Sequence, residues 1–297
     1  MAGTPLEENI IVKLNNSYYH LTASEKKVAD YVLGHKRQVQ FMSISELADE
    51  CGVAEATISR FCRRQKLHGY NAFKLALAKE TAREEAGMAA TAESEATAAL
   101  SAEEEEDAVI EMSRRQYAEY KAALSQTMAQ IRPERIREAV DLLTAADKVF
   151  CMGQGGSMIM AQEAAHLFST VSPRFFSVQD SHLQASAAAL LTSWDVLFFF
   201  SYSGSTKDIV DIMALARERG AKSILITRFA KSPGAACADV VLQCGSNEGP
   251  LQLGTVAARV AQLFLVDILY QEMCLRNPEE ARISRERIAD ALADKHL

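Results

Sequence analysis

The sequence predicts a two-domain chain: an all-helical N-terminal domain, then an α/β domain with a parallel sheet covered on both faces by helices. Three observations predict it. The 297 residues exceed the roughly 150 that are typical of one domain. Residues 5–80 carry helix start motifs and apolar spacings of three and four. From residue 148 onward, short continuous apolar runs alternate with helical stretches, which is typical of a parallel sheet.

The acidic charge is concentrated in one short segment. The formal net charge is -7, with 32 Lys and Arg against 39 Asp and Glu, and taken whole this argues against a nucleic-acid ligand. Residues 1–80, however, carry a net charge of +2, residues 81–107 carry -8, and residues 108–297 carry -1. We therefore expect a DNA-compatible helical domain over 1–80, an acidic Ala- and Glu-rich, partly helical linker over 81–112, and a C-terminal domain over 113–297.

Other sequence features limit the compartment and the chemistry. The most apolar run, 196–200, is far shorter than the roughly 20 residues that span a bilayer. Residues 1–8 have neither the basic start nor the apolar core of a secretory signal. The cysteines form no C-x-x-C pair, which disfavours a zinc site. We expect a cytoplasmic protein without a metal or a membrane partner, and mostly buried, reduced thiols at Cys51, Cys62, Cys151, Cys237, Cys244 and Cys274.

Two Ser/Thr-x-x-Glu motifs, at 22–25 and 43–46, predict helix N-termini where a hydroxyl and a carboxylate bond to the free amides. The second motif opens a short helix whose apolar stripe ends at Cys51. Gly52 suits a tight turn with left-handed backbone, and a second helix is expected from about Ala54 to Gln65. A short helix, a glycine turn and a second helix form the helix-turn-helix arrangement, whose second helix lies in the major groove of DNA.

The outer face of this second helix is basic. Six Lys and Arg and no acidic residue lie between Ala56 and Lys79. Because Arg side chains reach guanine edges or phosphates, and hydroxyls bond to either, the segment indicates DNA binding. The alternative is an ordinary solvated helix face. The candidate DNA contacts are Ser45, Thr57, Ser59, Arg60, Arg63, Arg64, Lys66, Tyr70 and Lys74.

The same residues resemble a known family. Residues 43–64, followed by 66–77, closely resemble the DNA-binding domain of RpiR-type bacterial transcription regulators, and the similarity extends over most of 5–80. The resemblance implies a double-stranded DNA operator as a partner. Ala54 departs from the family, which usually has a capping Ser at this position, and the loss of such a cap costs roughly 1 kcal/mol.

The C-terminal domain is expected to alternate strands and helices. Strands are expected at 148–152, 174–178, 196–201, 223–227 and 240–244. Helices are expected at 108–130, 133–145, 157–170, 180–191, 206–219 and 254–275. In parallel sheets of this kind, ligands bind beyond the carboxyl ends of the strands.

Two strand ends carry groups that suit an anion. Residues 153–157, Gly-Gln-Gly-Gly-Ser, place glycines and a hydroxyl at a helix N-terminus. Residues 201–206, Ser-Tyr-Ser-Gly-Ser-Thr, offer four hydroxyls for a phosphate, although an N-capping turn is the alternative. A nicotinamide cofactor is disfavoured, because Met158 interrupts the G-x-G-x-x-G spacing and no acidic residue ends the second strand. No cofactor is therefore expected.

Residues 130–275 resemble the sugar isomerase (SIS) domain, which binds phosphosugars. S-x-S-G-x-T at 201–206 is its most specific mark, and 155–157 match its first loop. The resemblance implies an α/β three-layer domain with a five-stranded parallel sheet, a phosphate held by the Ser/Thr loop, and sugar hydroxyls contacted from neighbouring loops. The candidate phosphosugar contacts are Gly155, Gly156, Ser157, Ser201, Ser203, Gly204, Ser205, Thr206, His182 and Glu248.

An RpiR-type domain followed by a SIS domain is the architecture of that regulator family. It implies a DNA-binding regulator of sugar or amino-sugar metabolism, more commonly a repressor, that is gated by a phosphosugar effector and has no catalytic residues. SIS domains also occur in aldose–ketose isomerases, which would use Glu248 or His182 as a general base. The segment 248–255 departs from the one common in the regulators, which leaves the ligand contacts there open.

One short helix reads few bases, so a homodimer or homotetramer is expected. The helix at 254–275 carries apolar residues on more than one face. It is either a subunit surface or simply a cover for the sheet, and the sequence favours neither.

Overall fold

The computed structural model of the protein describes residues 9–93, 102–251 and 255–293. The chain divides into two separately packed units. One contains residues up to 112 together with 248–251, and the other contains residues 113–247 together with those from 255 onward. Within the described ranges, no helix is both long enough and apolar enough to cross a membrane.

The first unit is built only of helices among its described residues. Its core is made by the apolar sides of short helices, with Leu14, Val28, Leu47, Phe61 and Phe73 fully buried. The rings of Phe61 and Phe73 meet edge to face, with centroids 5.6 Å apart. The elements are α1 (Ile10–Ser17), η1 (Tyr18–His20), α2 (Ala23–Gly34), α3 (Lys36–Val39), α4 (Ile44–Cys51), α5 (Glu55–Arg64) and α6 (Tyr70–Glu93).

Both expected capping boxes are present. At the start of α2, the amide of Thr22 donates to Glu25 Oε2 over 2.9 Å, and the amide of Glu25 donates to the Thr22 hydroxyl over 3.4 Å. At the start of α4, the amide of Ser43 donates to Glu46 Oε2 over 2.8 Å, and the amide of Glu46 donates to Ser43 Oγ over 3.1 Å. These local bonds explain why the two helices begin where the sequence predicts.

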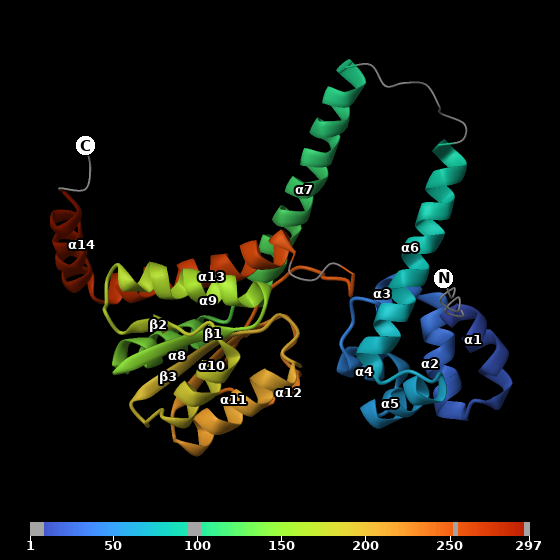
Figure 1. The fold of residues 1–297 in the computed structure, drawn as a ribbon, viewed down its shortest axis with the longest axis horizontal. Coiled ribbons are helices and arrows are strands. Elements are labelled where there is room, and N and C mark those ends of the chain that lie inside the picture. Colours follow the sequence, from blue (N-terminus) through green and yellow to red (C-terminus); the bar gives the residue numbers. More distant parts are fainter. Residues whose placement is uncertain (1–8, 94–101, 252–254, 294–297) are drawn as a thin grey trace, which may run out of the picture. The chain divides into compact units, whose positions relative to one another are not determined.

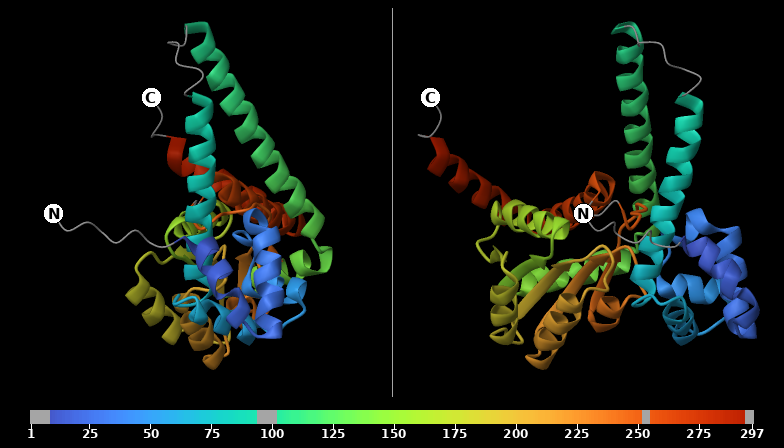
Figure 2. Two further views of the ribbon diagram at one scale, coloured as in Figure 1. Left: turned by 90° about the vertical axis from the view of Figure 1, so that its right-hand side faces the viewer. Right: turned by 45° about the vertical axis from the view of Figure 1, so that its right-hand side comes forward.

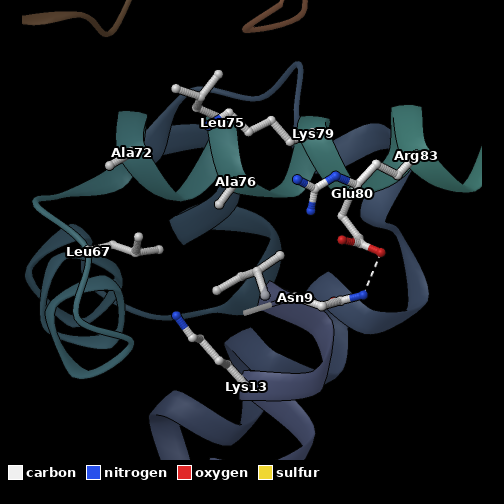
Figure 3. A pocket seen from close by; sticks show the side chains of 10 residues that line it. Asn9, Lys13, Leu67, Ala72, Leu75, Ala76, Lys79, Glu80 and Arg83 are labelled. Atoms are coloured by element: carbon white, nitrogen blue, oxygen red, sulfur yellow. Dashed lines mark hydrogen bonds between the residues drawn. The ribbon is translucent and has the colours of Figure 1, made fainter. Parts of the chain in front are cut away.

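A pocket lies between α1 and α6 (Figure 3). Asn9 caps α1 by accepting a hydrogen bond from the amide of Ile11 over 2.8 Å, and its own amide group donates to Glu80 on α6. The pocket also contains Lys13, Lys79 and Arg83. The Asn9–Glu80 bond therefore fastens the first helix to the last helix of this unit.

Both ends of the acidic segment are helical. α6 ends at Glu93, and α7 (Ala102–Gln130) begins within the acidic run. Ala and Glu are both good helix formers, which accounts for helix in a stretch without a sustained apolar stripe. Residues 94–101 of the expected linker lie outside the described residues.

The second unit contains the five-stranded parallel sheet, as predicted. The strands are β1 (Lys148–Gly153), β2 (Phe175–Ser177), β3 (Asp195–Phe200), β4 (Lys222–Thr227) and β5 (Val240–Gln243). They lie in the order β2-β1-β3-β4-β5, and every neighbouring pair is parallel. Gly153 at the end of β1 pairs with Phe200 at the end of β3, so the loops that follow these two strands leave the same edge of the sheet.

Helices cover both faces of the sheet, as Figures 1 and 2 show. Phe198 and Ile224 face one apolar cluster, whereas Leu197 and Leu225 face the other. β3 is buried along its whole length because both of its faces are covered. One face packs against α8 (Pro133–Ala145), α9 (Gly156–Ser169) and α13 (Val256–Arg276), and the other against α10 (Ser181–Ala189), α11 (Lys207–Glu218) and α12 (Pro233–Cys237).

Two helices were not expected from the sequence. α12 has five residues, too few to show a helical period. α14 (Pro278–Leu292) is rich in charge, and Ala281 is its one buried residue. α12 is therefore too short for a helical period to be read from it, whereas charged residues dominate the sequence of α14.

Candidate functional site

The turn between α4 and α5 has the geometry that the helix-turn-helix arrangement requires. Gly52 ends α4 with φ +60° and ψ +45°, the left-handed conformation in which glycine has no steric cost. Ala54 starts α5 and makes no side-chain capping bond among the described residues. Glu55 instead accepts a hydrogen bond from the hydroxyl of Ser45 on α4, and its charge lies in the first turn, where the helix dipole favours it.

α5 has one buried side and one exposed basic side. Ile58 and Phe61 are fully buried, as the spacing predicts. Arg60 and Arg63 are exposed on the opposite side and Ser59 is half-exposed. Lys66 is also exposed, two residues beyond the end of the helix. The structure thus brings Ser59, Arg60, Arg63 and Lys66 to the accessible surface of α5 and its C-terminal turn.

The other candidate DNA contacts have partners inside the unit. Tyr70 is buried and donates to the carbonyl of Met42 over 3.1 Å, and Lys74 Nζ donates to the same carbonyl over 3.1 Å. Burial lowers the pKa of Lys74. Thr57 is also buried and accepts a hydrogen bond from the Arg60 guanidinium over 3.2 Å. These contacts, like the bond of Ser45, hold α5 and the start of α6 in place.

Arg64 takes part in an ion pair that ties α5 to α2. Its Nη1 lies 2.6 Å from Glu25 Oε2, the carboxylate of the first capping box. Burial raises the pKa of Glu25, but hydrogen bonds from Thr22 and the charge of Arg64 outweigh this and leave the pKa below its ordinary value. No local pattern indicates this pair, because the two residues are 39 positions apart.

The first candidate ligand loop, after β1, depends on glycine. Gly155 has φ +55° and ψ −127°, a conformation almost restricted to glycine. A Cβ atom on Gly153 would lie 2.8 Å from the carbonyl oxygen of Ser157 and 3.0 Å from that of Phe200. The backbone of β1 therefore passes directly against the first turn of α9. Gly156 and Ser157 are half-exposed in that turn, although the amide of Ser157 already donates to the carbonyl of Gln154 over 3.1 Å. The positive end of the dipole of α9 lies at this turn and favours an anion.

The second candidate ligand loop, after β3, is held by its own hydroxyls. The amide of Gly204 donates to Ser201 Oγ over 3.1 Å, and the amide of Ser205 donates to Ser203 Oγ over 3.3 Å. Gly204 has φ +58°, and its carbonyl accepts from the amide of Gly234 over 2.8 Å. Ser201 is buried, whereas Ser203 is half-exposed and Ser205 is exposed.

Thr206 stands at the N-terminus of α11, but its hydroxyl makes no capping bond within the described part of the chain. Ser232, at the start of α12, does cap its helix by accepting from the amide of Ala235 over 3.3 Å. Helix capping therefore does not account for the Thr206 hydroxyl, which is exposed to solvent. Since α9 and α11 both begin at the carboxyl edge of the sheet, two helix N-termini serve this site.

The two candidate general bases are placed differently. His182 is exposed in the first turn of α10, after β2, which pairs with β1. Glu248 is half-buried beyond β5 and belongs to the short segment that is not grouped with the sheet unit. The structure thus places His182 on the same unit as the two loops and does not group Glu248 with them.

Two glutamines that the sequence did not single out position the first loop. Gln184 is fully buried on α10 and donates to the carbonyl of Gly153 over 3.0 Å and to that of Val178 over 2.7 Å. Its own carbonyl accepts from the Gln154 side chain over 2.8 Å. No local pattern marks this pair, because Gln154 and Gln184 are 30 positions apart.

Comparison with known proteins places both units. Residues 8–84 match the model of the helix-turn-helix domain of the rpiR family, and residues 142–271 match that of the SIS domain. An uncharacterized HTH-type transcriptional regulator, TTE0211 of Caldanaerobacter subterraneus subsp. tengcongensis, is 34% identical over 266 residues, 88% of each chain.

Solved structures agree. The Vibrio vulnificus NanR protein complexed with ManNAc-6P is similar over 97% of this chain and 100% of its own, with 26% identity and a TM-score of 0.80. The sugar isomerase domain of an RpiR transcription factor from Sphaerobacter thermophilus covers 59% of this chain and 96% of its own, with 27% identity and a TM-score of 0.54. These relatives are regulators, which favours the regulator over the isomerase. The chain belongs to the RpiR family of helix-turn-helix transcription regulators with a C-terminal SIS domain.

Proposed function

We propose that this regulator controls sugar or amino-sugar metabolism, as a repressor, and that a phosphosugar bound to its SIS domain changes its affinity for the operator. The observation that carries the proposal is the set of hydroxyls at 203–206. They lie beside a left-handed glycine at the carboxyl edge of the sheet, and the hydroxyl of Thr206 is not used for capping.

The chemistry of the two loops suits a phosphate ester. The hydroxyls of Ser203 and Thr206 can donate neutral hydrogen bonds to phosphate oxygens. The hydroxyl of Ser205 can do so after it leaves the carbonyl of Ser203, to which it donates over 2.9 Å. The N-termini of α9 and α11 add favourable dipoles. Ser157, at the end of the first loop, offers a further hydroxyl at the same edge of the sheet. We assign a sugar hydroxyl to His182, which lies on the same unit as the two loops. The complex of the similar NanR protein with ManNAc-6P supports an N-acetylhexosamine phosphate as the first ligand to test.

For DNA, we propose direct contacts by Ser59, Arg60, Arg63 and Lys66, four solvent-accessible residues of α5 and its C-terminal turn. Their hydroxyl and cationic groups suit base edges and phosphates. Arg64 is also exposed, but it is paired with Glu25. Ser45, Thr57, Arg64, Tyr70 and Lys74 act indirectly, by holding the helix that presents them.

Gating requires that the effector bind the DNA-competent and DNA-incompetent states with different affinities. We propose that the protein acts in the cytoplasm as a homodimer or a homotetramer, because two recognition helices at a fixed spacing are needed to read paired half-sites. Displacement of the two helices from that spacing then weakens binding.

A thermal-shift screen tests the ligand. We expect at least one compound among hexose and N-acetylhexosamine 6-phosphates, including ManNAc-6P, to raise the melting temperature of the full chain. The shift should disappear in Ser203→Ala and persist in Ser193→Ala, a matched control at an exposed serine outside both loops. Absence of any shift, or an equal shift in Ser203→Ala, would contradict the proposal.

A further inference from the structure

A chain of hydrogen bonds joins the second ligand loop to α7. The hydroxyl of Tyr202, within that loop, donates to the carbonyl of Ser246 over 2.9 Å, and Arg228 Nε donates to the same carbonyl over 3.2 Å. The amide of Ser246 in turn donates to the side-chain carbonyl of Gln126 on α7 over 3.1 Å. Residue 246 thus lies between the loop and the helix and is bonded to both.

The neighbouring residue strengthens the attachment to α7. The amide of Gly245 donates to the hydroxyl of Thr127 over 2.8 Å, and Thr127 is fully buried. A Cβ atom on Gly245 would lie 2.4 Å from the carbonyl oxygen of Ala123, so the backbone after β5 packs directly on the last turns of α7. Any displacement of residues 245–246 is therefore transmitted to the end of this helix.

Ser246 itself is held in a conformation that serine rarely adopts. Its φ is +86°, and such a conformation costs on the order of 1–3 kcal/mol in a residue other than glycine. It is 4% exposed, and its hydroxyl makes no hydrogen bond within the described part of the chain. The bonds donated by Tyr202 and Arg228, together with the bond that Gln126 accepts, therefore help to maintain this conformation, so that loss of one of them favours a different backbone state.

Tyr202 belongs to the ligand loop, and its backbone and ring contact residues at the end of β4. It lies between Ser201 and Ser203, and its carbonyl accepts from the amide of Arg228 over 3.0 Å and from the hydroxyl of Thr227 over 3.1 Å. Its ring meets that of Phe229 edge to face at 5.9 Å. A rearrangement of residues 201–206 around a phosphate that displaces Tyr202 would move the hydroxyl that holds Ser246.

We propose that the Tyr202–Ser246–Gln126 bonds form the link by which occupancy of the SIS domain reaches the DNA-binding unit. α7 runs without interruption from Ala102 to Gln130, and its residues up to 112 group with the helical unit, whereas those from 113 group with the sheet. The link rests on the proposed function, since it needs an effector at the loop. It goes beyond that function by naming Tyr202 and Gln126 as positioning residues for the coupling.

Two variants interrupt the link at opposite ends. Tyr202→Phe removes the donated hydrogen bond and keeps the ring, and Gln126→Met removes the acceptor on α7 with little change in size. Tyr270→Phe is the matched control, because that hydroxyl is also hydrogen-bonded in the same unit, to Thr170 and Arg285 over 3.0 Å each, but lies outside the link.

The experiment measures three quantities for each full-length protein. They are the affinity for the sugar phosphate by calorimetry, the affinity for DNA by fluorescence anisotropy, and the ratio of DNA affinities with and without saturating sugar phosphate. The sugar phosphate is whichever member of a hexose and N-acetylhexosamine 6-phosphate panel, ManNAc-6P included, changes the wild-type ratio most. The DNA is a duplex selected by the wild-type protein from a random library.

In Tyr202→Phe and Gln126→Met we expect the ratio to move toward one by about fivefold, the effect of one net hydrogen bond. The two separate affinities should change less than about threefold, and Tyr270→Phe should behave as wild type. An unchanged ratio in both variants overturns the link and leaves the proposed function standing. A loss of sugar-phosphate affinity that accounts for the whole change also overturns it. A wild-type protein whose DNA affinity responds to no compound overturns the proposed function and the link together.

Discussion

Replacement of Gly204 by Ala tests whether the second ligand loop is built as described. Gly204 has φ +58°, and an added Cβ atom would lie 2.0 Å from Ser232 Oγ, 2.7 Å from Ser232 Cβ and 3.1 Å from Thr227 Oγ1. The substitution therefore introduces both backbone strain and a steric clash. Neither Ser232 nor Thr227 can move freely, because Ser232 caps α12 and Thr227 donates to the carbonyl of Tyr202.

The expected loss of stability is the sum of these two contributions. A left-handed conformation costs an alanine about 1–2 kcal/mol, and overpacking of a filled site costs about 1–3 kcal/mol more. Gly204→Ala should thus lower the free energy of unfolding of the sheet unit by about 2–5 kcal/mol. Gly52→Ala is the matched control. Gly52 has φ +60°, and no described atom lies within 4 Å of its Cβ position, so only the backbone term of about 1–2 kcal/mol applies.

Urea unfolding followed by hydrogen exchange and mass spectrometry separates the two units, because peptides from each are distinguished. We expect Gly204→Ala to lower protection around β3 and α11 and to abolish sugar-phosphate binding, with the helical unit unchanged. A loss of stability in Gly204→Ala no larger than that in Gly52→Ala would refute the argument that Ser232 fills the space above this glycine.

Three further predictions concern the helical unit. Arg60→Ala and Arg63→Ala should each weaken DNA binding by about 1–3 kcal/mol if the side chain contacts a base, or lower the slope of log affinity against log salt by about one if it contacts a phosphate. Anisotropy titrations at several salt concentrations measure both, and unchanged binding in both variants would contradict the assignment of α5 as the recognition helix. Ala54→Ser supplies an N-cap side chain for α5 and should stabilise this unit by about 1 kcal/mol, measured as a higher urea midpoint. No gain would mean that the hydrogen bond between Ser45 and Glu55 already stabilises the N-terminus of α5. The pKa of Glu25 lies below its ordinary 4.5, so the stability that its ionised carboxylate contributes is present above pH 4.5 and is lost as the pH falls through the folded-state value. Glu25→Gln should therefore reduce the acid sensitivity of the unit, measured by circular dichroism between pH 6 and 2. An acid transition identical to that of the wild type would show that the pair with Arg64 is unimportant.

Local patterns predicted the parts of the fold that local chemistry determines. The capping boxes at Thr22 and Ser43 and the turn at Gly52 follow from interactions within a few residues. The strands were predicted because β3 and its neighbours are continuously apolar. By contrast, the spacing could not show that Tyr70 and Lys74 face the carbonyl of Met42, about thirty residues earlier.

The candidate site divides in the same way. The hydroxyls of 201–206 stand out because they gather around one glycine at a strand end. The hydrogen bonds that hold the surrounding loops cannot be recognised in the local sequence. Gln126 and Ser246 are 120 residues apart, and Gln154 and Gln184 come from different elements of the sheet unit. Only the order of the strands brings such partners together.

We propose that a sugar phosphate at 201–206 changes the affinity of the protein for DNA. One anisotropy titration tests it directly: a selected operator duplex against wild type and Ser203→Ala, each with and without the sugar phosphate that stabilises the wild type most. We expect the wild-type affinity to change by about 5–150-fold. Ser203→Ala should bind DNA as the free wild-type protein does and should not respond. Equal DNA affinity of the wild type with and without the ligand, or the same response in Ser203→Ala, would contradict the account.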